Sequence, residues 1–316
     1  MKKLWSIPLI IFVLVAATLW VERSGEVVIP IQDGTLYGTL LEPGKNETGT
    51  LIIFASGSGP TDRDGNSGIL KGKNDSLKAL AYALKKEGIA TFRFDQRPSG
   101  KTVKHAKLDN ISFEVLADDL TRVIREMKSM KKFDRIVLLG HSQGVMVTAL
   151  AAEGEPVDGL ICIAGAARPI DRILLEQLAA AGNVDMKTAE RLLGELKAGQ
   201  ELQNVPKELE ALFAPRNRNF LATWMQYDPY EVYKKLDLPT LFIYGTRDTQ
   251  IKPTELTYWK DLAKSGDSVV LEKMNHVLKV IENEEKDSLK SYSDPSYPLH
   301  PGLAGAIMGY LGKLTN

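Results

Sequence analysis

Gly140-His141-Ser142-Gln143-Gly144 is the stretch of sequence that decides the fold. It follows an apolar run, 135–139, typical of a buried strand, and it leads into a run of helical character, 145–152. A serine at such a sharp strand-to-helix turn has a strained backbone, and only glycines allow the neighbouring chain to pass so closely. The pattern therefore predicts a nucleophilic Ser142 whose hydroxyl projects above a sheet.

Apolar runs typical of strands alternate with segments of helical period on both sides of this turn. That alternation predicts an α/β fold, a mainly parallel sheet flanked by helices on both faces. A hairpin with the turn signal Asp33-Gly34 opens the domain, and Pro30 in its first strand favours a sheet edge. The expected strands are 26–31, 35–41, 50–55, 89–94, 135–139, 159–164, 240–244 and 268–271, and the expected helices are 76–86, 113–130, 143–153, 253–264 and 302–314.

One long stretch, 167–236, breaks this alternation. It carries no strand signal and shows only amphipathic patterns at helical spacing. We therefore expect a helical insertion over 167–236, between two parts of one α/β core, 26–166 and 237–316. Residues 1–25 stand apart as a targeting element.

A histidine is required near Ser142, because a serine hydroxyl is a poor nucleophile until a base removes its proton. Among the four histidines, His276 follows the last expected strand, in a loop at the carboxyl end of the sheet that can reach the serine. His141 lies inside the turn, His105 lies in a polar loop, and His300 precedes the last helix. His276 is therefore the candidate base, and a purely structural histidine is the alternative.

The base in turn needs an anion that fixes its tautomer and stabilises its protonated form. Asp248 lies just past the carboxyl end of the strand-like run 240–244. The chain order Ser142, Asp248, His276 is the order expected on this architecture. We predict these three as a catalytic triad, with Asp171 as the second candidate for the acid and a solvated loop aspartate as the alternative reading of Asp248.

Two backbone N–H groups are candidates to stabilise a negatively charged oxygen. Gln143 lies at the start of the helix after the nucleophile, where its N–H is available to an oxyanion. The loop after the strand 50–55 is Ser56-Gly57-Ser58-Gly59-Pro60, whose small residues let the backbone approach an acyl group. We assign the second N–H to Ser58.

Taken together, these motifs resemble the α/β-hydrolase superfamily of serine hydrolases, from about Glu26 onward. Residues 57–66 and 94–101 resemble a bacterial branch of esterases related to the serine aminopeptidase and dienelactone hydrolase groups. This chain has Ser56 where that branch usually has histidine, and Pro98 where it generally has glycine. The resemblance implies the α/β-hydrolase fold and a lid, formed by the helical insertion, over the site.

The lid is expected to choose the substrate. Its apolar and aromatic side chains suit an acyl chain or an aromatic acid, and the alternative is that they only pack the lid onto the sheet. The five side chains that we predict to line the pocket are Phe213, Phe220, Trp224, Met225 and Tyr227. For Asp62, Arg63 and Asp64 a local salt-bridged loop is favoured over recognition of substrate charge.

Composition excludes several other classes of partner. Forty basic residues balance forty acidic ones, so the footprint of a nucleic-acid-binding protein is missing. The four histidines make no ligand-spaced cluster with carboxylates or with the single cysteine, Cys162, so no metal is expected, and the chemistry needs no cofactor. Cys162 lies in an apolar run and is read as a core residue.

The N-terminus differs in kind from the rest of the chain. Lys2 and Lys3 precede eighteen uncharged residues, 4–21, long enough at about 1.5 Å per residue to reach across a bilayer core of about 30 Å. A retained membrane anchor is favoured over a cleaved signal peptide. The small residues that a cleavage site requires lie inside the apolar run and not after it. The lysines should then hold the enzyme outside the cytoplasm.

Three functions are compatible with these residues. Hydrolysis of carboxylic esters through an acyl-enzyme on Ser142 leads, and hydrolysis of amides in small peptides uses the same triad. The third is a noncatalytic binding protein that kept the fold, although such proteins usually lose a triad member. For the two enzymatic functions the expected partner is a small-molecule ester or amide.

Overall fold

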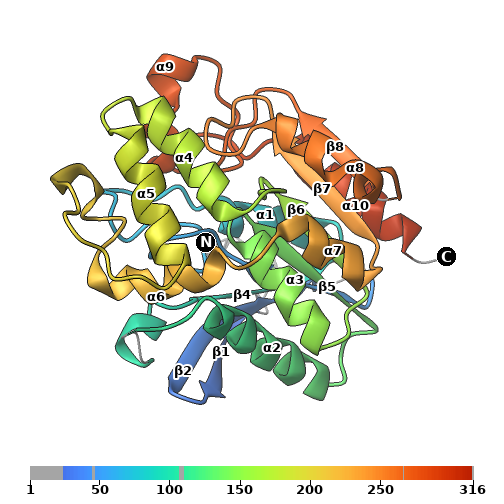
Figure 1. The fold of residues 1–316 in the computed structure, drawn as a ribbon. Helices are drawn as coiled ribbons and strands as arrows, with labels where there is room; N and C mark the ends of the chain where they lie inside the picture. The colour runs from blue at the N-terminus through green and yellow to red at the C-terminus, as the bar shows by residue number, and fades with distance from the viewer. Residues whose placement is uncertain (1–23, 45–46, 107–109, 266, 315–316) are drawn as a thin grey trace, which may run out of the picture.

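In the computed structural model of the chain, residues 24–44, 47–106, 110–265 and 267–314 are described (Figure 1). They form one eight-stranded sheet in the order β1-β2-β4-β3-β5-β6-β7-β8. Pairing is antiparallel from β1 through β2 to β4 and parallel from there to β8. The strands are β1 (Ser24–Ile31), β2 (Gly34–Leu41), β3 (Thr50–Ala55), β4 (Ala90–Phe94), β5 (Arg135–His141), β6 (Gly159–Ile163), β7 (Thr240–Gly245) and β8 (Asp267–Leu271).

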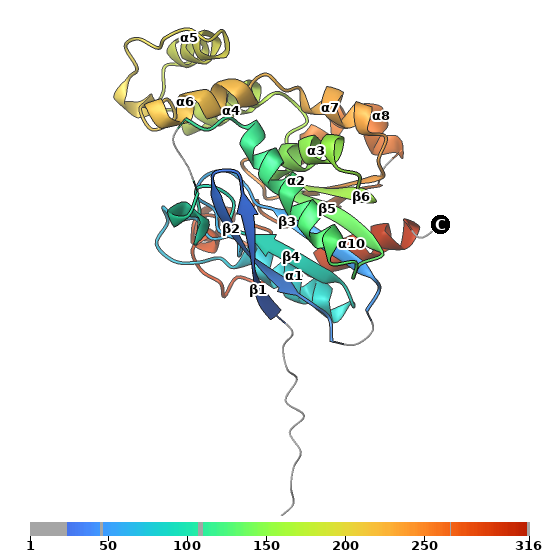
Figure 2. The ribbon, with the colours of Figure 1, turned by 90° about the horizontal axis from the view of Figure 1, so that it is seen from below.

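Helices cover both faces of this sheet. Contacts place α1 and α10 on one face and α2, α3, α7 and α8 on the other, whereas α4, α5 and α6 form a separate group (Figures 1 and 2). The α-helices are α1 (Ser76–Lys86), α2 (Glu114–Ser129), α3 (Gly144–Gly154), α4 (Ile170–Ala181), α5 (Met186–Lys197), α6 (Pro215–Trp224), α7 (Pro229–Leu236), α8 (Leu256–Ser265), α9 (Glu284–Asp287) and α10 (Gly302–Lys313). Short 3₁₀ turns are η1 (Thr102–Lys104), η2 (Lys207–Leu209), η3 (Pro253–Glu255) and η4 (Lys290–Tyr292).

Burial on both faces explains why the central strands are apolar at every position. All six residues of β3 are buried. Because successive side chains of a strand point to opposite faces, Ile53 packs into the core under α2 and α3 while Ile52 packs into the core over α1 and α10. The sequence-based prediction of an α/β fold with a mainly parallel sheet is confirmed, and Pro30 lies in an edge strand as expected.

The segment expected as an insertion contains α4 to α7 and no strand among its residues, all of which are described. Its last helix differs from the others, because α7 packs in the same layer as α3. The hydroxyl of Tyr233 on α7 donates to the carbonyl oxygen of Val145 on α3 at 2.8 Å. In the structure α7 is thus part of the covering of the sheet, and only α4 to α6 stand over its carboxyl edge.

The expected apolar segment 4–21 lies outside the described residues. Within the part of the chain that is described, no helix combines the length and apolar character needed to cross a bilayer. Residues 282–301, between β8 and α10, contain the short helix α9 and the 3₁₀ turn η4.

Candidate active site

Ser142 lies where β5 ends and α3 begins, at the carboxyl edge of the sheet. Its φ of 54° is in the left-handed region, which is strained for a residue with a side chain. The turn is held in place because the N–H of Ser142 donates to the carbonyl oxygen of Ile163, at the end of β6, at 2.9 Å. The predicted turn is therefore present, with the serine in the strained position that the motif implies.

Steric contact accounts for both glycines of the motif. A Cβ on Gly140 would lie 2.5 Å from the carbonyl oxygen of Gly144 and from the backbone of Val145. A Cβ on Gly144 would lie 2.2 Å from the carbonyl oxygen of Ala55, at the end of β3. Neither position has room for a larger residue, so the Gly-x-Ser-x-Gly spacing follows from the closeness of β3, β5 and α3.

Asp248 and His276 meet at the same edge of the sheet, as predicted. Asp248 follows β7 and His276 follows β8, and the Asp248 Oδ2 lies 2.8 Å from the His276 Nδ1. Both side chains are buried. The other carboxylate oxygen of Asp248 accepts hydrogen bonds from the backbone N–H groups of Gln250 and Ile251 at 2.8 and 2.9 Å. These two bonds hold the orientation of the carboxylate toward His276.

Asp171, the second candidate, has a different partner. It lies on α4, where its carboxylate accepts a hydrogen bond from the Lys197 Nζ of α5 at 3.0 Å. This ion pair joins two lid helices, whereas Asp248 is the carboxylate that contacts His276.

The structure shows no hydrogen bond between Ser142 and His276 in the part of the chain that it describes. Among those residues the His276 Nε2 also has no other hydrogen-bond partner. Catalytic hydrogen bonds are often long in the absence of substrate and tighten when it binds. The Asp248–His276 half of the predicted relay is thus assembled, and we expect the contact between Ser142 and His276 to form when substrate binds.

His141, which the sequence placed only inside the turn, supports the loop of the candidate base. Its Nε2 lies 2.8 Å from the carbonyl oxygen of His276, and the two rings are 5.0 Å apart. Burial, and secondarily the neighbouring His276, lowers the pKa of His141 to about 4. His141 is therefore neutral at neutral pH and donates its Nε2–H to that carbonyl. The position of His141 next to the nucleophile was the signal in the sequence that could have indicated this role. Its hydrogen-bond partner could not be predicted from the sequence, because that partner is 135 residues away.

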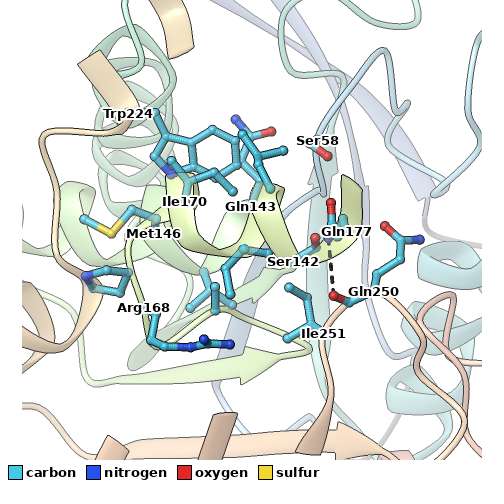
Figure 3. Close-up of a pocket in the computed structure, with 15 residues that line it drawn as sticks. Ser58, Ser142, Gln143, Met146, Arg168, Ile170, Gln177, Trp224, Gln250 and Ile251 are labelled. Carbon is cyan, nitrogen blue, oxygen red and sulfur yellow. Dashed lines mark hydrogen bonds between the residues drawn. The ribbon is translucent and has the colours of Figure 1, made fainter. Parts of the chain in front are cut away.

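The two predicted oxyanion donors, Ser58 and Gln143, lie on the wall of one cavity beside Ser142 (Figure 3). Within the described residues, neither backbone N–H donates to a protein acceptor. Both are thus available to a bound molecule. The loop that carries Ser58 is braced by Ser56, whose hydroxyl donates to the carbonyl oxygen of Thr61 at 3.3 Å.

Gln96, two residues after β4, orients this loop and was missed by sequence reasoning. Its buried amide Nε2 donates to the carbonyl oxygen of Gly57 at 2.7 Å. That carbonyl and the N–H of Ser58 belong to the same trans peptide group, so they point in opposite directions. Binding of the carbonyl by Gln96 on one side therefore directs the N–H of Ser58 to the other side. The resemblance of segment 94–101 to the esterase branch was the signal in the sequence for a functional role of Gln96. It could not show that the partner of Gln96 is the carbonyl of Gly57.

The cavity is mostly apolar, and the lid helices form part of its wall. It is lined by Ser58, Ser142, Gln143, Val145, Met146, Ala166, Arg168, Ile170, Ile173, Leu174, Gln177, Trp224, Pro229, Gln250 and Ile251 (Figure 3). Of the five lid side chains predicted to line the pocket, only Trp224 lies on this wall. Residues of α4, which the prediction left out, supply most of the lid's share.

The other four predicted pocket residues pack inside the protein instead. Phe213 and Met225 are buried in the lid core. Phe220 and Tyr227 contact Phe113, just before α2, with ring centroids 5.4 and 6.1 Å away. The prediction is corrected for these four, because the lid needs an apolar surface of its own to attach to the sheet.

Charged groups near the cavity are neutralised by one another. Arg168 on the wall forms a salt bridge with Glu176 and donates through its Nε to the buried Glu255 at 2.9 Å. The ion pairs of the loop that holds Asp62, Arg63 and Asp64 are not local, contrary to what the sequence favoured, but join the loop to β4 and the residue after it, whereas Asp62 accepts hydrogen bonds within the loop. Arg63 binds Asp95 at 2.7 Å and Asp64 pairs with Arg93.

Cys162 is buried in β6, and its contacts indicate a structural role. Its Sγ donates to the hydroxyl of Tyr233 at 3.0 Å, and burial raises the pKa of the thiol to about 12. It is not reactive at neutral pH.

A sheet of this order, with a strained serine where β5 turns into α3, is that of an α/β-hydrolase. Residues 72–278 match the family described as "Serine aminopeptidase, S33", and the chain belongs to this family. The resemblance recognised in the sequence is thereby confirmed.

Three proteins illustrate what the chain is similar to. Esterase EstD from Thermotoga maritima is 29% identical over 250 residues, which is 76% of this chain but only 57% of that relative's length. In structure, the Pyrococcus furiosus esterase Pf2001 matches with a TM-score of 0.60 at 14% identity, covering 94% of this chain and 92% of that one. Est1E from Butyrivibrio proteoclasticus matches with a TM-score of 0.56 at 16% identity, covering 91% and 99%. At such identities the two solved structures show a shared fold.

Proposed function

We propose that this protein hydrolyses carboxylic esters through an acyl-enzyme on Ser142. The observation that carries the proposal is the buried contact of 2.8 Å between Asp248 and His276, at the sheet edge where Ser142 is held in a strained turn. The description of EstD as an esterase supports this choice of reaction.

The geometry suits the following steps. The His276 Nε2 takes the proton of the Ser142 hydroxyl, whose oxygen attacks the ester carbonyl carbon and forms a tetrahedral oxyanion. The N–H groups of Ser58 and Gln143 donate to that oxyanion, and Asp248 stabilises the imidazolium. Collapse of the intermediate breaks the bond to the alcohol, which leaves with the proton from His276. Water, activated by the same imidazole, then attacks the acyl-enzyme and releases the acid.

Esters are favoured over peptides because of the charge of the cavity wall. An aminopeptidase needs a carboxylate that captures the substrate's terminal amine, and among the described residues no aspartate or glutamate lines the cavity. In the part of the chain that the structure describes, the charged side chain on that wall is Arg168, and its two carboxylate partners, Glu176 and Glu255, are engaged by its guanidinium and not free to bind an ammonium ion. The proposed activity therefore differs from the aminopeptidase activity in the family's description.

A comparison of leaving groups tests the proposed reaction. We expect kcat/KM for p-nitrophenyl butyrate to exceed that for alanine and leucine p-nitroanilides by at least about a thousandfold, because the wall lacks an amine-binding carboxylate. A fluorophosphonate probe should label the folded protein at Ser142 only. Faster cleavage of the anilides would favour the amidase. Failure of both the substrates and the probe would favour the noncatalytic binding protein.

Gln96 has an expected role as a positioning residue for the oxyanion. Gln96→Leu should lower kcat for p-nitrophenyl butyrate by about tenfold to a hundredfold and leave KM nearly unchanged, because the oxyanion exists only in the transition state. Binding of a trifluoromethyl ketone, which forms a tetrahedral adduct with a serine, should weaken in parallel.

Ser99→Ala is the matched control for Gln96→Leu. The Ser99 hydroxyl donates to the backbone carbonyl of Gln96 at 2.7 Å, so its removal deletes a buried hydrogen bond of the same turn without touching the amide. Equal losses of kcat and of thermal stability in both variants would contradict the positioning role, since a general weakening of the turn would then explain both.

We further propose that the N-terminal segment anchors the protein with its catalytic edge turned away from the membrane. Ser24, the first described residue, pairs with Leu41, which pairs with Thr91 near the start of β4. It thus lies at the amino edge of the parallel strands, opposite to Ser142, and Figure 2 shows the start of β1 far from α4 to α6. The substrate would then come from the aqueous side. The intact mass of protein extracted from membranes distinguishes a retained segment from a cleaved one.

A further inference from the structure

Gln143 carries a side-chain amide that the proposed mechanism does not use. Its backbone N–H is the candidate oxyanion donor, while its side chain is among those that line the cavity (Figure 3). The residue is only 5% exposed. Its Nε2 is buried and has no hydrogen-bond partner among the described residues.

An unpaired amide in such a place is costly. Leaving a buried donor without a partner costs about 1–3 kcal/mol, and most buried polar groups in proteins are paired. The carboxamide can turn about its terminal side-chain torsion, which is soft, and so reach an acceptor in the adjoining cavity.

The other side-chain amides of the same wall, by contrast, have hydrogen-bond partners within the protein. Gln177 on α4 donates through its Nε2 to the backbone carbonyl of Gln250 at 3.3 Å, drawn as a dashed line in Figure 3. Gln250 donates through its own Nε2 to the hydroxyl of Tyr292 at 2.6 Å. Arg168 is held by two carboxylates. Of the amides that the described residues place on this wall, Gln143 is the one whose nitrogen has no partner in the protein.

We infer that Gln143 recognises an oxygen atom, an ether, hydroxyl or carbonyl, in the part of the ester that enters the cavity. This inference rests on the proposed esterase function and specifies its substrate class. Most of the remaining wall is apolar, and its other amides and Arg168 are already paired within the protein, so the substrate combines a hydrocarbon body with one oxygen beyond the ester group itself. A plain alkanoate would leave the amide unpaired in the complex and would bind less favourably in the transition state.

Matched esters that differ by one atom test this inference. The substrates are p-nitrophenyl hexanoate and its three analogues in which an oxygen replaces the third, fourth or fifth atom of the acyl chain. A second series of substrates tests the alcohol side of the ester. It pairs hexanoate esters of alcohols that contain one ether oxygen with hexanoate esters of the matching alcohols that contain none. For each pair, kcat/KM of the oxygen compound is divided by that of the carbon compound, in wild type and in Gln143→Met. Dividing the two ratios cancels the intrinsic reactivity of the esters.

We expect this double ratio to reach about tenfold at one oxygen position, the effect of one hydrogen bond. Gln177→Met, which removes an amide already paired in the protein, should leave the wild-type preference unchanged. Gln143→Glu retains the shape but replaces the donor with a carboxylate, and should reverse the preference for an ether oxygen. It also serves if the methionine variant does not fold.

A double ratio within about twofold of unity at every position in both series would overturn the inference. In that case wild type still hydrolyses esters, and the proposed esterase function stands. If wild type turned over none of the esters, the proposed function and the inference would both fail.

Discussion

Ser142→Ala is expected to lower kcat for p-nitrophenyl butyrate by at least about 10⁴-fold, to a level set by binding and by the oxyanion donors alone. The reason is that the acyl-enzyme cannot form without the hydroxyl, while the backbone N–H groups of Ser58 and Gln143 are unaffected. Initial rates under saturating substrate, together with mass spectrometry of the trapped acyl-enzyme, provide the measurement.

The variant should fold as well as the wild type. Alanine at position 142 has the same Cβ and so the same backbone strain at a φ of 54°. Thermal unfolding checks this, and Ser129→Ala, an exposed serine of α2, controls for the loss of any hydroxyl. Retention of more than about one-tenth of the activity in Ser142→Ala would remove Ser142 from the mechanism.

Asp248→Asn is expected to lower kcat by about 10⁴-fold while the protein stays folded. An asparagine has nearly the same shape, but it carries no charge to stabilise the imidazolium. Its amide nitrogen, placed toward the His276 Nδ1, would also favour the wrong imidazole tautomer. Steady-state kinetics with p-nitrophenyl butyrate measures the loss.

The matched control for this substitution is Asp171→Asn. Asp171 was the second candidate for the acid from sequence, and it binds Lys197 on the neighbouring lid helix. Its replacement should change kcat by less than about threefold, because it breaks one partly exposed ion pair. Comparable losses in the two variants would show that the carboxylate was assigned wrongly.

Much of the fold was predictable because its signals are local. The strand-like runs are apolar on both faces, which occurs only where helices cover both sides of a sheet, and β3 and α1 coincide with their predicted ranges. The turn at Ser142 was equally local, since its two glycines are required by contacts within a few residues and with the adjacent strand.

The pairing of Asp248 with His276 could be anticipated for a different reason. In a parallel sheet all strands end at the same edge, so residues that follow β5, β7 and β8 are brought together whatever the intervening chain does. Chain order and strand ends were therefore enough to select both, and to prefer Asp248 to Asp171.

The lid could not be predicted in the same way. Phe213, Phe220, Trp224, Met225 and Tyr227 are alike in chemistry, and the sequence does not say which face of a helix meets the cavity. Trp224 stacks on Phe113 at 4.9 Å and still reaches the cavity wall, whereas Phe213 and Met225 are buried in the lid. That choice depends on how helices pack against one another over long distances in sequence.

The sequence by itself determined the class of fold, the strained serine and the edge at which the chemistry lies, because periodicity and turn sterics act over a few residues. Only the tertiary structure decided that Gln96 binds the carbonyl of Gly57, that His141 supports the loop of His276, and that the amide of Gln143 is unpaired beside the cavity. These are contacts between side chains and distant segments, and hydrogen-bond partners are set by three-dimensional proximity that no local pattern encodes.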